Sequence, residues 1–415
     1  MDVTGERLRE DIEANAAFGA LDVEGHGRTV LAGSEANRQA RDYLVNRLED
    51  AGLTVRVDPV GNIAGKWVPA TADATAEPVA TGSHLDSVPA GGIFDGPLGV
   101  FSGLEAVRSL QEQDISLSRP IEVVSFTEEE GTRFGPGLLG SSVAAGARPA
   151  HEALHRTDDE GITLETALTE IGYQGGGEIE VAEWDAWLEL HVEQSERLEA
   201  ADLPVGVVTD ITGITHCNVT VIGEANHAGA TPMGQRTDAL AAASEFVLDV
   251  ESGANDLVRS GSETAVGTVG LVEVSPNATN VVPGKVEIGL DIRAVDHGVM
   301  NALVSTAEKS LQRLETERGI ETTFDREFDL EPVSMCTRVQ TAATQAGDAA
   351  GVGTMSLHSG AAHDSMYVAN VTDAGMLFAR SKEGISHSPR EWTDWADCEA
   401  ATAVLAGAIA ELATD

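Results

Sequence analysis

The chain has 415 residues, and its 68 Asp and Glu against 26 Lys and Arg give a formal net charge of −42 at pH 7. This charge argues against nucleic acid and anionic membrane surfaces as partners, because both would repel it. The length favours two domains, and a hydrophobic content of 42% is enough for a sizeable core.

The acidic residues are spread evenly along the chain, and only four of the basic residues are Lys. This composition favours a protein adapted to molar salt, where screening weakens the self-repulsion. An acidic interaction tail is the alternative, although no block of five or more like charges occurs. Three cysteines without a CxxC pattern indicate a reducing compartment. Because neither a signal peptide nor an apolar run of about twenty residues is visible, we expect a cytoplasmic protein.

Helical and strand-like patterns alternate in the first half of the chain. Helices are predicted over residues 36–51, 98–112 and 163–171. Short apolar runs predict buried strands at 79–83, 121–126 and 186–190. Such alternation is typical of an α/β sheet with helices on its faces.

The pattern changes near residue 213. Strands are predicted at 213–223, 265–274, 285–295 and 320–328, and helices at 236–250 and 298–318. Further helices are predicted at 338–351 and 397–413. We therefore expect an α/β catalytic domain with a mixed sheet and flanking helices, formed by residues 1–211 and 329–415. A smaller α+β domain, residues 212–328, would interrupt it.

Polar residues follow the first predicted strand in "GSHLDSVPAGGIFDG". His84 and Asp86 are two residues apart, so at strand spacing both side chains leave on the same side. A carboxylate placed in this way can orient an imidazole that binds a metal. Asp95 follows in a glycine-rich turn before Pro97, although a polar loop with a helix N-cap would give the same pattern.

Three consecutive carboxylates, Glu128, Glu129 and Glu130, follow the second strand in "VVSFTEEEGTRFG". A solvated acidic loop would be the default in so acidic a chain. However, His191 ends a third strand in "LELHVEQ", and His387 lies in the loop "GISHSPREW". Histidines and carboxylates at the ends of several strands are what a metal site built on a sheet requires. With no thiolate nearby, these donors favour Zn²⁺ or Mn²⁺ without choosing between them.

Eight segments occur in a fixed order along the chain: "GSHLDSVPAGGIFDG", "EEEGTRFG", "LHVEQ", "HAGATPM", "NATNVVPG", "DIRAVD", "SGAAHDSM" and "SHSPRE". Together they resemble the M20 metallopeptidase-like amidohydrolases, specifically the hydantoinase/carbamoylase branch. That branch contains N-carbamoyl-L-amino acid hydrolases, β-ureidopropionases and allantoate amidohydrolases. The resemblance covers essentially the whole chain and implies hydrolysis of the C–N bond of an N-carbamoyl-L-amino acid or a related ureido acid. The products would be the amino acid, CO₂ and ammonia.

The resemblance implies two divalent metal ions per subunit, Zn²⁺ or Mn²⁺, with Co²⁺ or Ni²⁺ able to substitute. The implied ligands are Asp95 as a bridge, His84 and His191 for one ion, and Glu130 and His387 for the other. Glu129 matches the family's general base and acid, and Asp86 the residue that orients His84. Glu128 is then left as solvated or structural. The family also tends to have a cis peptide after the bridging residue, here Asp95–Gly96.

The resemblance assigns further residues to substrate binding. His227 matches an oxyanion donor that arrives when the inserted lid domain closes, often from the partner in a homodimer formed through that domain. Arg293 matches a clamp on the substrate carboxylate. Without the resemblance, they would be a loop histidine and a surface arginine. The other implied substrate contacts are Gln194, Asn280, Gly360 and His363. His363 also fits a position that supports a metal ligand without contacting the substrate.

Two departures, Ala362 and Ser195 in place of glycines, leave the implied ligands intact but weaken any inference about the exact substrate. One alternative is an aminoacylase or dipeptidase of the wider family, against which "EEEGTRF" and "HVEQ" favour the carbamoylase branch. The other is a binding protein without turnover, which would not need Glu129. Six histidines match no ligand position and are expected to be structural or on the surface: His26, His151, His155, His216, His297 and His358.

Overall fold

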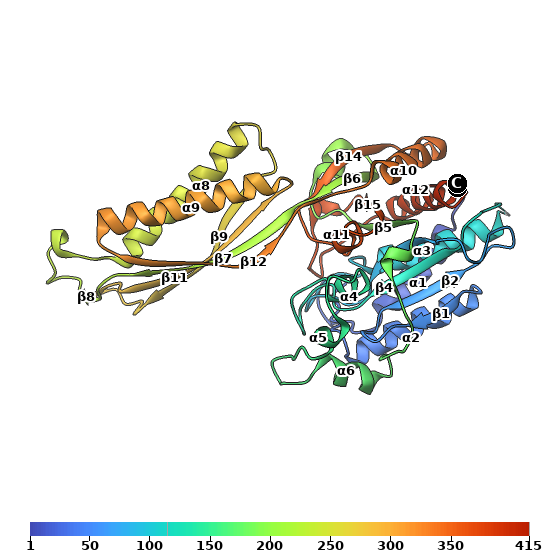
Figure 1. The fold of residues 1–415 in the computed structure, drawn as a ribbon, viewed down its shortest axis with the longest axis horizontal. Coiled ribbons are helices and arrows are strands. Elements are labelled where there is room, and N and C mark those ends of the chain that lie inside the picture. Colours follow the sequence, from blue (N-terminus) through green and yellow to red (C-terminus); the bar gives the residue numbers. More distant parts are fainter. Residues whose placement is uncertain (114, 415) are drawn as a thin grey trace. The chain divides into compact units, whose positions relative to one another are not determined.

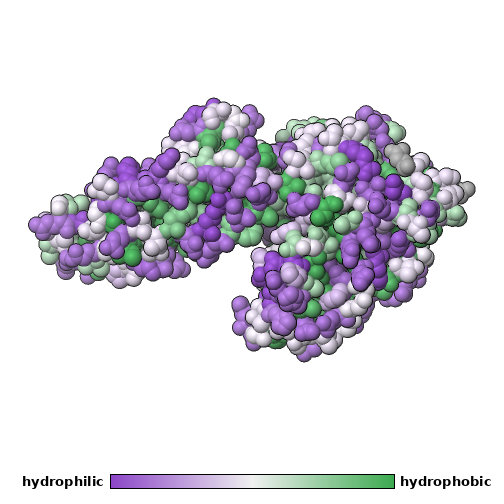
Figure 2. All heavy atoms as spheres, viewed as in Figure 1, coloured by the Kyte–Doolittle hydropathy of each residue, from purple (hydrophilic) through white to green (hydrophobic). Residues whose placement is uncertain are grey.

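A computed structural model describes residues 1–113 and 115–414 of the chain (Figure 1). The chain divides into two compact units, each with its own hydrophobic core. The larger unit comprises Met1–Thr209, Ser334–Leu357 and the residues from His363 onward, and the smaller unit comprises Asp210–Val333 and His358–Ala362. Figure 2 shows a largely hydrophilic surface on the visible face, as expected from the acidic composition.

A nine-stranded mixed sheet runs in the order β1-β2-β4-β3-β5-β15-β6-β13, with β14 paired to β6. Strands β3, β4, β5 and β15 are parallel, whereas β1, β2 and β6 are antiparallel to their neighbours. The bounds are β1 Thr54–Val57, β2 Ile63–Trp67, β3 Val79–His84, β4 Ile121–Phe126, β5 Ala186–Val192, β6 Val205–Ile211, β13 Val333–Ser334, β14 Thr354–Ser359 and β15 Asp373–Ala379. The three apolar runs predicted as buried strands are confirmed as β3, β4 and β5, and every residue in them is buried.

Helices flank this sheet (Figure 1). Helix α3 is buried along almost its whole length because it packs against β3 and β5 and also against α1 and α12. The bounds are α1 Gly5–Ala16, α2 Glu35–Asp50, α3 Pro97–Glu112, α4 Leu139–Ala144, α5 Ala150–Leu154, α6 Leu164–Ile171, α7 Arg197–Ala201, α10 Thr337–Ala350, α11 Ser365–Val368 and α12 Trp395–Leu412. Short 3-10 turns occur at Val181–Glu183, Met233–Gln235 and Lys382–Gly384. The five helices predicted for this part of the sequence are confirmed as α2, α3, α6, α10 and α12.

The smaller unit contains a four-stranded antiparallel sheet in the order β12-β7-β11-β9, with α8 and α9 on one face (Figure 1). The bounds are β7 Gly213–Ile222, β8 Asn226–His227, α8 Ala239–Arg259, β9 Val266–Ser275, β10 Val281–Val282, β11 Lys285–Ala294, α9 His297–Arg318 and β12 Glu321–Leu330. Alternate residues of β11 point their apolar side chains into the core, so one face of this strand is buried and the other is more exposed. Strands β8 and β10 pair separately.

The cis peptide bonds among the described residues are Gly135–Pro136 and Ser275–Pro276. The cis bond expected at Asp95–Gly96 is therefore wrong for this structure. Gly96 instead makes the turn with φ 80° and ψ −60°, a conformation that glycine adopts without a steric penalty. A Cβ at this position would lie 2.6 Å from the His84 ring. Across residues 1–113 and 115–414, no helix combines the length and the apolar character needed to cross a membrane.

Candidate metal centre

The parallel strands bring the sequence-predicted residues to one edge of the sheet. His84 is the last residue of β3, the acidic triplet follows β4, and His191 lies next to the end of β5. The carboxyl ends of parallel strands meet at the same edge, which is where open α/β sheets hold their ligands. The His84 and His191 rings are both buried, and their centroids lie 5.9 Å apart.

Asp95 lies at the centre of these residues and directs its two carboxylate oxygens to different neighbours. Its Oδ1 is 3.4 Å from His84 Nε2 and 3.3 Å from His191 Nε2. Its Oδ2 is 3.5 Å from His387 Nε2, which is itself 3.3 Å from Glu130 Oε2. Two groups of potential metal ligands therefore share Asp95. We call His84, Asp95 and His191 the inner group, and Asp95, Glu130 and His387 the outer group.

Main-chain carbonyls orient both rings of the inner group. His84 Nδ1 lies 3.0 Å from the carbonyl oxygen of Asp86, and His191 Nδ1 lies 3.0 Å from that of Val192. A proton on each Nδ1 leaves Nε2 with its lone pair directed at Asp95. His84 Nε2 is buried and has no hydrogen-bond partner among the described residues. A buried acceptor nitrogen between a second imidazole and a carboxylate suits a divalent metal, so these residues fit one.

Asp86 contacts both groups. Its carboxylate Oδ1 is 3.9 Å from His84 Nδ1, farther than its own main-chain carbonyl oxygen. Its Oδ2 accepts a hydrogen bond of 3.2 Å from the main-chain N–H of Glu130. In this structure, Asp86 therefore orients His84 through its carbonyl and fixes the acidic triplet through its carboxylate.

The three carboxylates of the triplet lie in three different environments. Glu128 is fully buried, has φ 56°, and accepts main-chain N–H bonds from Arg133 at 2.7 Å and Phe134 at 2.6 Å. It holds the loop together and is not solvated. Glu129 Oε2 lies 3.7 Å from His84 Nε2 with a side chain 10% exposed, and Glu130 belongs to the outer group.

Burial dominates the electrostatics of this site. Burial, reinforced by the charge of Asp95, raises the pKa of Glu130 to about 8. Burial and neighbouring carboxylates likewise raise the pKa of Glu129 well above its usual range. Burial opposes protonation of His191, but the charge of Asp95 outweighs it and raises the histidine pKa to about 9. Such a site holds protons that a metal ion would displace on binding.

Two predicted substrate contacts lie beside the potential metal ligands. Gln194 Nε2 is 3.3 Å from Asp95 Oδ2 and 3.4 Å from Ser386 Oγ, so it contacts a ligand in this structure. His363 is buried, and its ring packs edge-on against that of His191 with centroids 4.6 Å apart. Burial lowers the pKa of His363 well below its usual range. The hydroxyl of Ser195 donates to Glu193.

The remaining predicted residues lie in the smaller unit. His227 is exposed, and its Nδ1 accepts main-chain N–H bonds from Gly229 and Ala230, at 3.0 and 3.1 Å. The carbonyl of Asn280 accepts the N–H of Ala228 at 2.9 Å, which brings Asn280 next to His227.

Arg293 is bonded to Gly360, a further predicted residue of the smaller unit. It donates to both carboxylate oxygens of Asp291, at 2.9 and 3.1 Å, and to the carbonyl oxygen of Gly360, at 2.9 Å. The structure thus brings Arg293 and Gly360 together, although they are far apart in the sequence.

Two residues that were not predicted from the sequence contact the candidate metal centre. Glu391 and Ser386 both bond to the Asp95 segment. They are the first and last residues of the segment "SHSPRE", in which the sequence pattern indicated only His387, because histidine is a common metal ligand. The six histidines that match no ligand position in the sequence also fall in neither group of potential ligands found among the described residues.

Three comparisons relate the chain to known proteins. The profile of the family described as Peptidase family M20/M25/M40 matches residues 80–411. An N-carbamoyl-L-amino acid amidohydrolase of Geobacillus stearothermophilus is 40% identical over 391 residues, covering 93% of this chain and 94% of the relative. Allantoate deiminase 1 of Glycine max is 34% identical over 416 residues, covering 93% and 84% of the two chains. A crystal structure of a hydantoinase/carbamoylase family amidase from Burkholderia multivorans superposes with a TM-score of 0.94 at 37% identity, covering 100% of this chain and 99% of the other.

Proposed function

The chain belongs to peptidase family M20/M25/M40 and is a hydrolase of non-peptide C–N bonds, and we propose that its substrate is an N-carbamoyl-L-amino acid. The products would be the amino acid, CO₂ and ammonia. One observation carries the mechanism that we propose: the two carboxylate oxygens of Asp95 face two separate groups of ligands. Allantoate or ureidopropionate is the alternative substrate, and the similarity to an allantoate deiminase supports the first of these.

We assign two divalent cations, Zn²⁺ or Mn²⁺, to this site. His84 and His191 would hold one, Glu130 and His387 the other, and Asp95 both. Bound there, the cations would supply Lewis-acid polarisation of the substrate carbonyl and a water acidic enough to attack it at neutral pH.

Glu129 is the proton carrier in this proposal. Its carboxylate lies beside the inner group without belonging to either group of ligands, and it is nearly buried. Because burial raises its pKa, Glu129 is basic enough to take the proton of the attacking water. It then returns that proton to the leaving nitrogen, so the residue ends the cycle in its starting state.

The smaller unit would bind the remaining parts of the substrate. We assign the substrate carboxylate to Arg293, whose planar guanidinium suits bidentate binding. Asp291 occupies that guanidinium in this structure, so the substrate carboxylate must displace or share it. We assign oxyanion stabilisation to His227, whose Nδ1 is already bonded and whose Nε2 remains to donate. Asn280, Gly360, Gln194 and His363 are proposed as further substrate contacts.

We also propose a homodimer formed through strand β9. This strand is an edge of its sheet, and its one charged residue is Glu273. Leu271 and Val272 are 49% and 48% exposed. The opposite edge, β12, carries five charged residues, which is a common protection against pairing. An unprotected apolar edge suits pairing with the same strand of a second copy.

Light scattering would test the dimer. Leu271→Lys should give a monomer, whereas Thr323→Lys on the β12 edge should leave the wild-type mass unchanged. A wild-type monomer, or a dimer that survives Leu271→Lys, would contradict this interface.

Ammonia release would test the reaction. The assay would use molar KCl, added Mn²⁺ and a panel of N-carbamoyl-L-amino acids, with allantoate and ureidopropionate alongside. We expect turnover of one class, abolished by a chelator and restored by metal. If folded, metal-loaded protein leaves every member of the panel intact, the substrate is instead an acyl-amino acid or a dipeptide, as for an aminoacylase or dipeptidase.

A further inference from the structure

The loop that carries His387 enters the metal centre from the C-terminal part of the chain. The His387 side chain is 51% exposed and the residue has φ 53°. Among the described residues, no main-chain carbonyl is bonded to its ring, in contrast to His84 and His191. The position of this ligand therefore depends on how the loop itself is attached.

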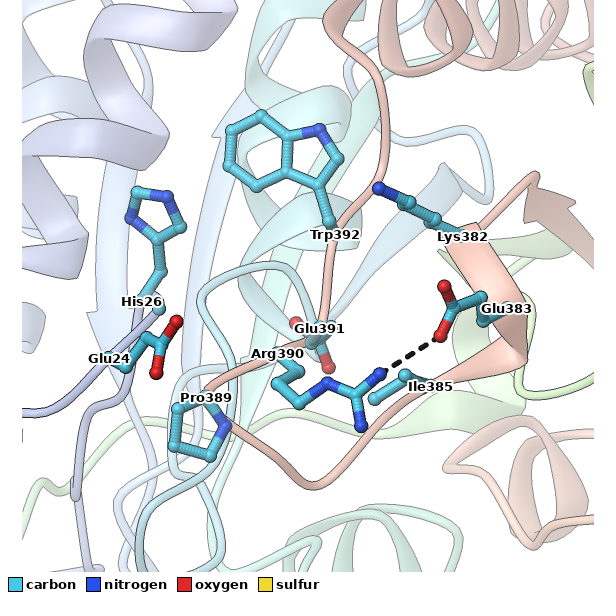
Figure 3. Close-up of a pocket in the computed structure, with 10 residues that line it drawn as sticks. Glu24, His26, Lys382, Glu383, Ile385, Pro389, Arg390, Glu391 and Trp392 are labelled. Atoms are coloured by element: carbon cyan, nitrogen blue, oxygen red, sulfur yellow. Dashed lines mark hydrogen bonds and ion pairs between the residues drawn. The ribbon is translucent and has the colours of Figure 1, made fainter.

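Glu391 attaches the loop to the segment that carries Asp95. Its carboxylate is almost fully buried, and Oε1 accepts the main-chain N–H groups of Phe94 at 2.8 Å and Asp95 at 3.1 Å. The approach is so close that a Cβ at Gly92 would lie 2.1 Å from the same oxygen. Figure 3 shows Glu391 among the residues that line a cavity of about 690 Å³. It also shows the ion pair of Arg390 and Glu383 in the same loop, at 2.9 Å.

Ser386 extends this attachment to the carboxylate of Asp95. Its Oγ lies 2.5 Å from Asp95 Oδ2 and 3.0 Å from Glu391 Oε2. A hydroxyl has one hydrogen to donate, and the shorter contact identifies Asp95 as the acceptor. Ser386 thus fixes the oxygen that faces Glu130 and His387, whereas Oδ1 faces the two histidines held by the sheet.

We propose that Glu391 and Ser386 are positioning residues that build the outer metal position by tying the His387 loop to Asp95. This inference rests on the proposed metal centre. It assigns the two residues to the outer group alone, because His84 and His191 lie at strand ends and are oriented by main-chain carbonyls. Losing either residue should therefore weaken binding of the outer ion and leave binding of the inner ion nearly unchanged.

Mn²⁺ titrated calorimetrically into metal-free protein would test this inference. The wild type should bind two ions. Glu391→Ala or Ser386→Ala should lower the affinity for the second, outer ion at least tenfold and change the affinity for the first, inner ion less than threefold. Glu391→Gln should restore the second ion, because its amide oxygen can accept the same two N–H groups and its NH₂ can donate to Ser386 Oγ. Glu391→Asp is one methylene too short and should not restore it. Glu383→Ala, an exposed glutamate of the same loop, is the matched control and should bind as wild type.

The outcomes separate this inference from the function on which it rests. A wild type that binds no metal refutes the metal centre itself. If the wild type binds two ions and the variants lose affinity for both ions equally, or for neither ion, Glu391 and Ser386 are not positioning residues of the outer group. Thermal unfolding of the metal-free variants shows whether they fold. Should Glu391→Ala not fold, Ser386→Ala decides, because it keeps the bonds from Glu391 to the main chain.

Discussion

The inner and outer groups of the candidate metal centre share Asp95 but are built in different ways. In the inner group, both histidines are buried at the ends of central strands, and main-chain carbonyls orient their rings. In the outer group, His387 lies half exposed in a loop held by side chains. A ligand fixed before binding loses less entropy when it binds a metal. The comparison therefore predicts unequal affinities, with the inner position the tighter one.

Glu129 provides the largest expected effect, because it lies next to the inner group and belongs to neither. Glu129→Gln should keep both ions but lower kcat about 100- to 10,000-fold, the usual loss when a general base is removed. Metal analysis of the purified variant, together with its kcat, checks this. If an ion is lost together with activity, Glu129 is a metal ligand and belongs to the inner group.

Removing one histidine from each group tests the asymmetry itself. His191→Ala should lower the affinity for the inner ion by more than about 10- to 100-fold, which is the loss typical when a residue that supports a metal ligand is substituted. His387→Ala should release the outer ion and leave the inner one near its wild-type affinity. Equilibrium dialysis against Zn²⁺ at several concentrations would measure both. Equal losses of both ions in both variants would show that the two positions fill as one unit.

Much of this arrangement could be predicted from the sequence. The runs that became β3, β4 and β5 are apolar throughout because parallel strands are covered on both faces, and their ends located His84, the acidic triplet and His191. Glu128 could not be distinguished from a solvated carboxylate, because its partners are main-chain groups of Arg133 and Phe134. Glu391 was missed for the same reason: it binds backbone about 300 residues away in sequence, and no spacing rule reports that contact.

Arg293 gives a smaller effect, and it lies outside both groups. Arg293→Ala should raise KM about 10- to 100-fold for a substrate with a carboxylate, as expected for the loss of a hydrogen-bonded charge worth about 1.5–3 kcal/mol. Both metal affinities should stay unchanged. Steady-state kinetics on the acid and on its amide analogue would measure this, since the amide should be insensitive. An unchanged KM for the acid would remove Arg293 from the site and leave it as the surface partner of Asp291.

Substitution of Gln194 is expected to have the smallest effect. It distinguishes a contact to the substrate from a contact to Asp95. As a proposed substrate contact, its loss should raise KM. Its amide, however, bonds to Asp95 Oδ2 at 3.3 Å, the oxygen of the outer group. A contact of this length is worth about 1 kcal/mol, so we expect Gln194→Ala to weaken the outer ion about fivefold and the inner ion not at all. Mn²⁺ binding and KM measured on the same preparation separate the two roles. A higher KM with unchanged metal affinity would make Gln194 a substrate contact only, and the outer oxygen of Asp95 would then depend on Ser386 alone.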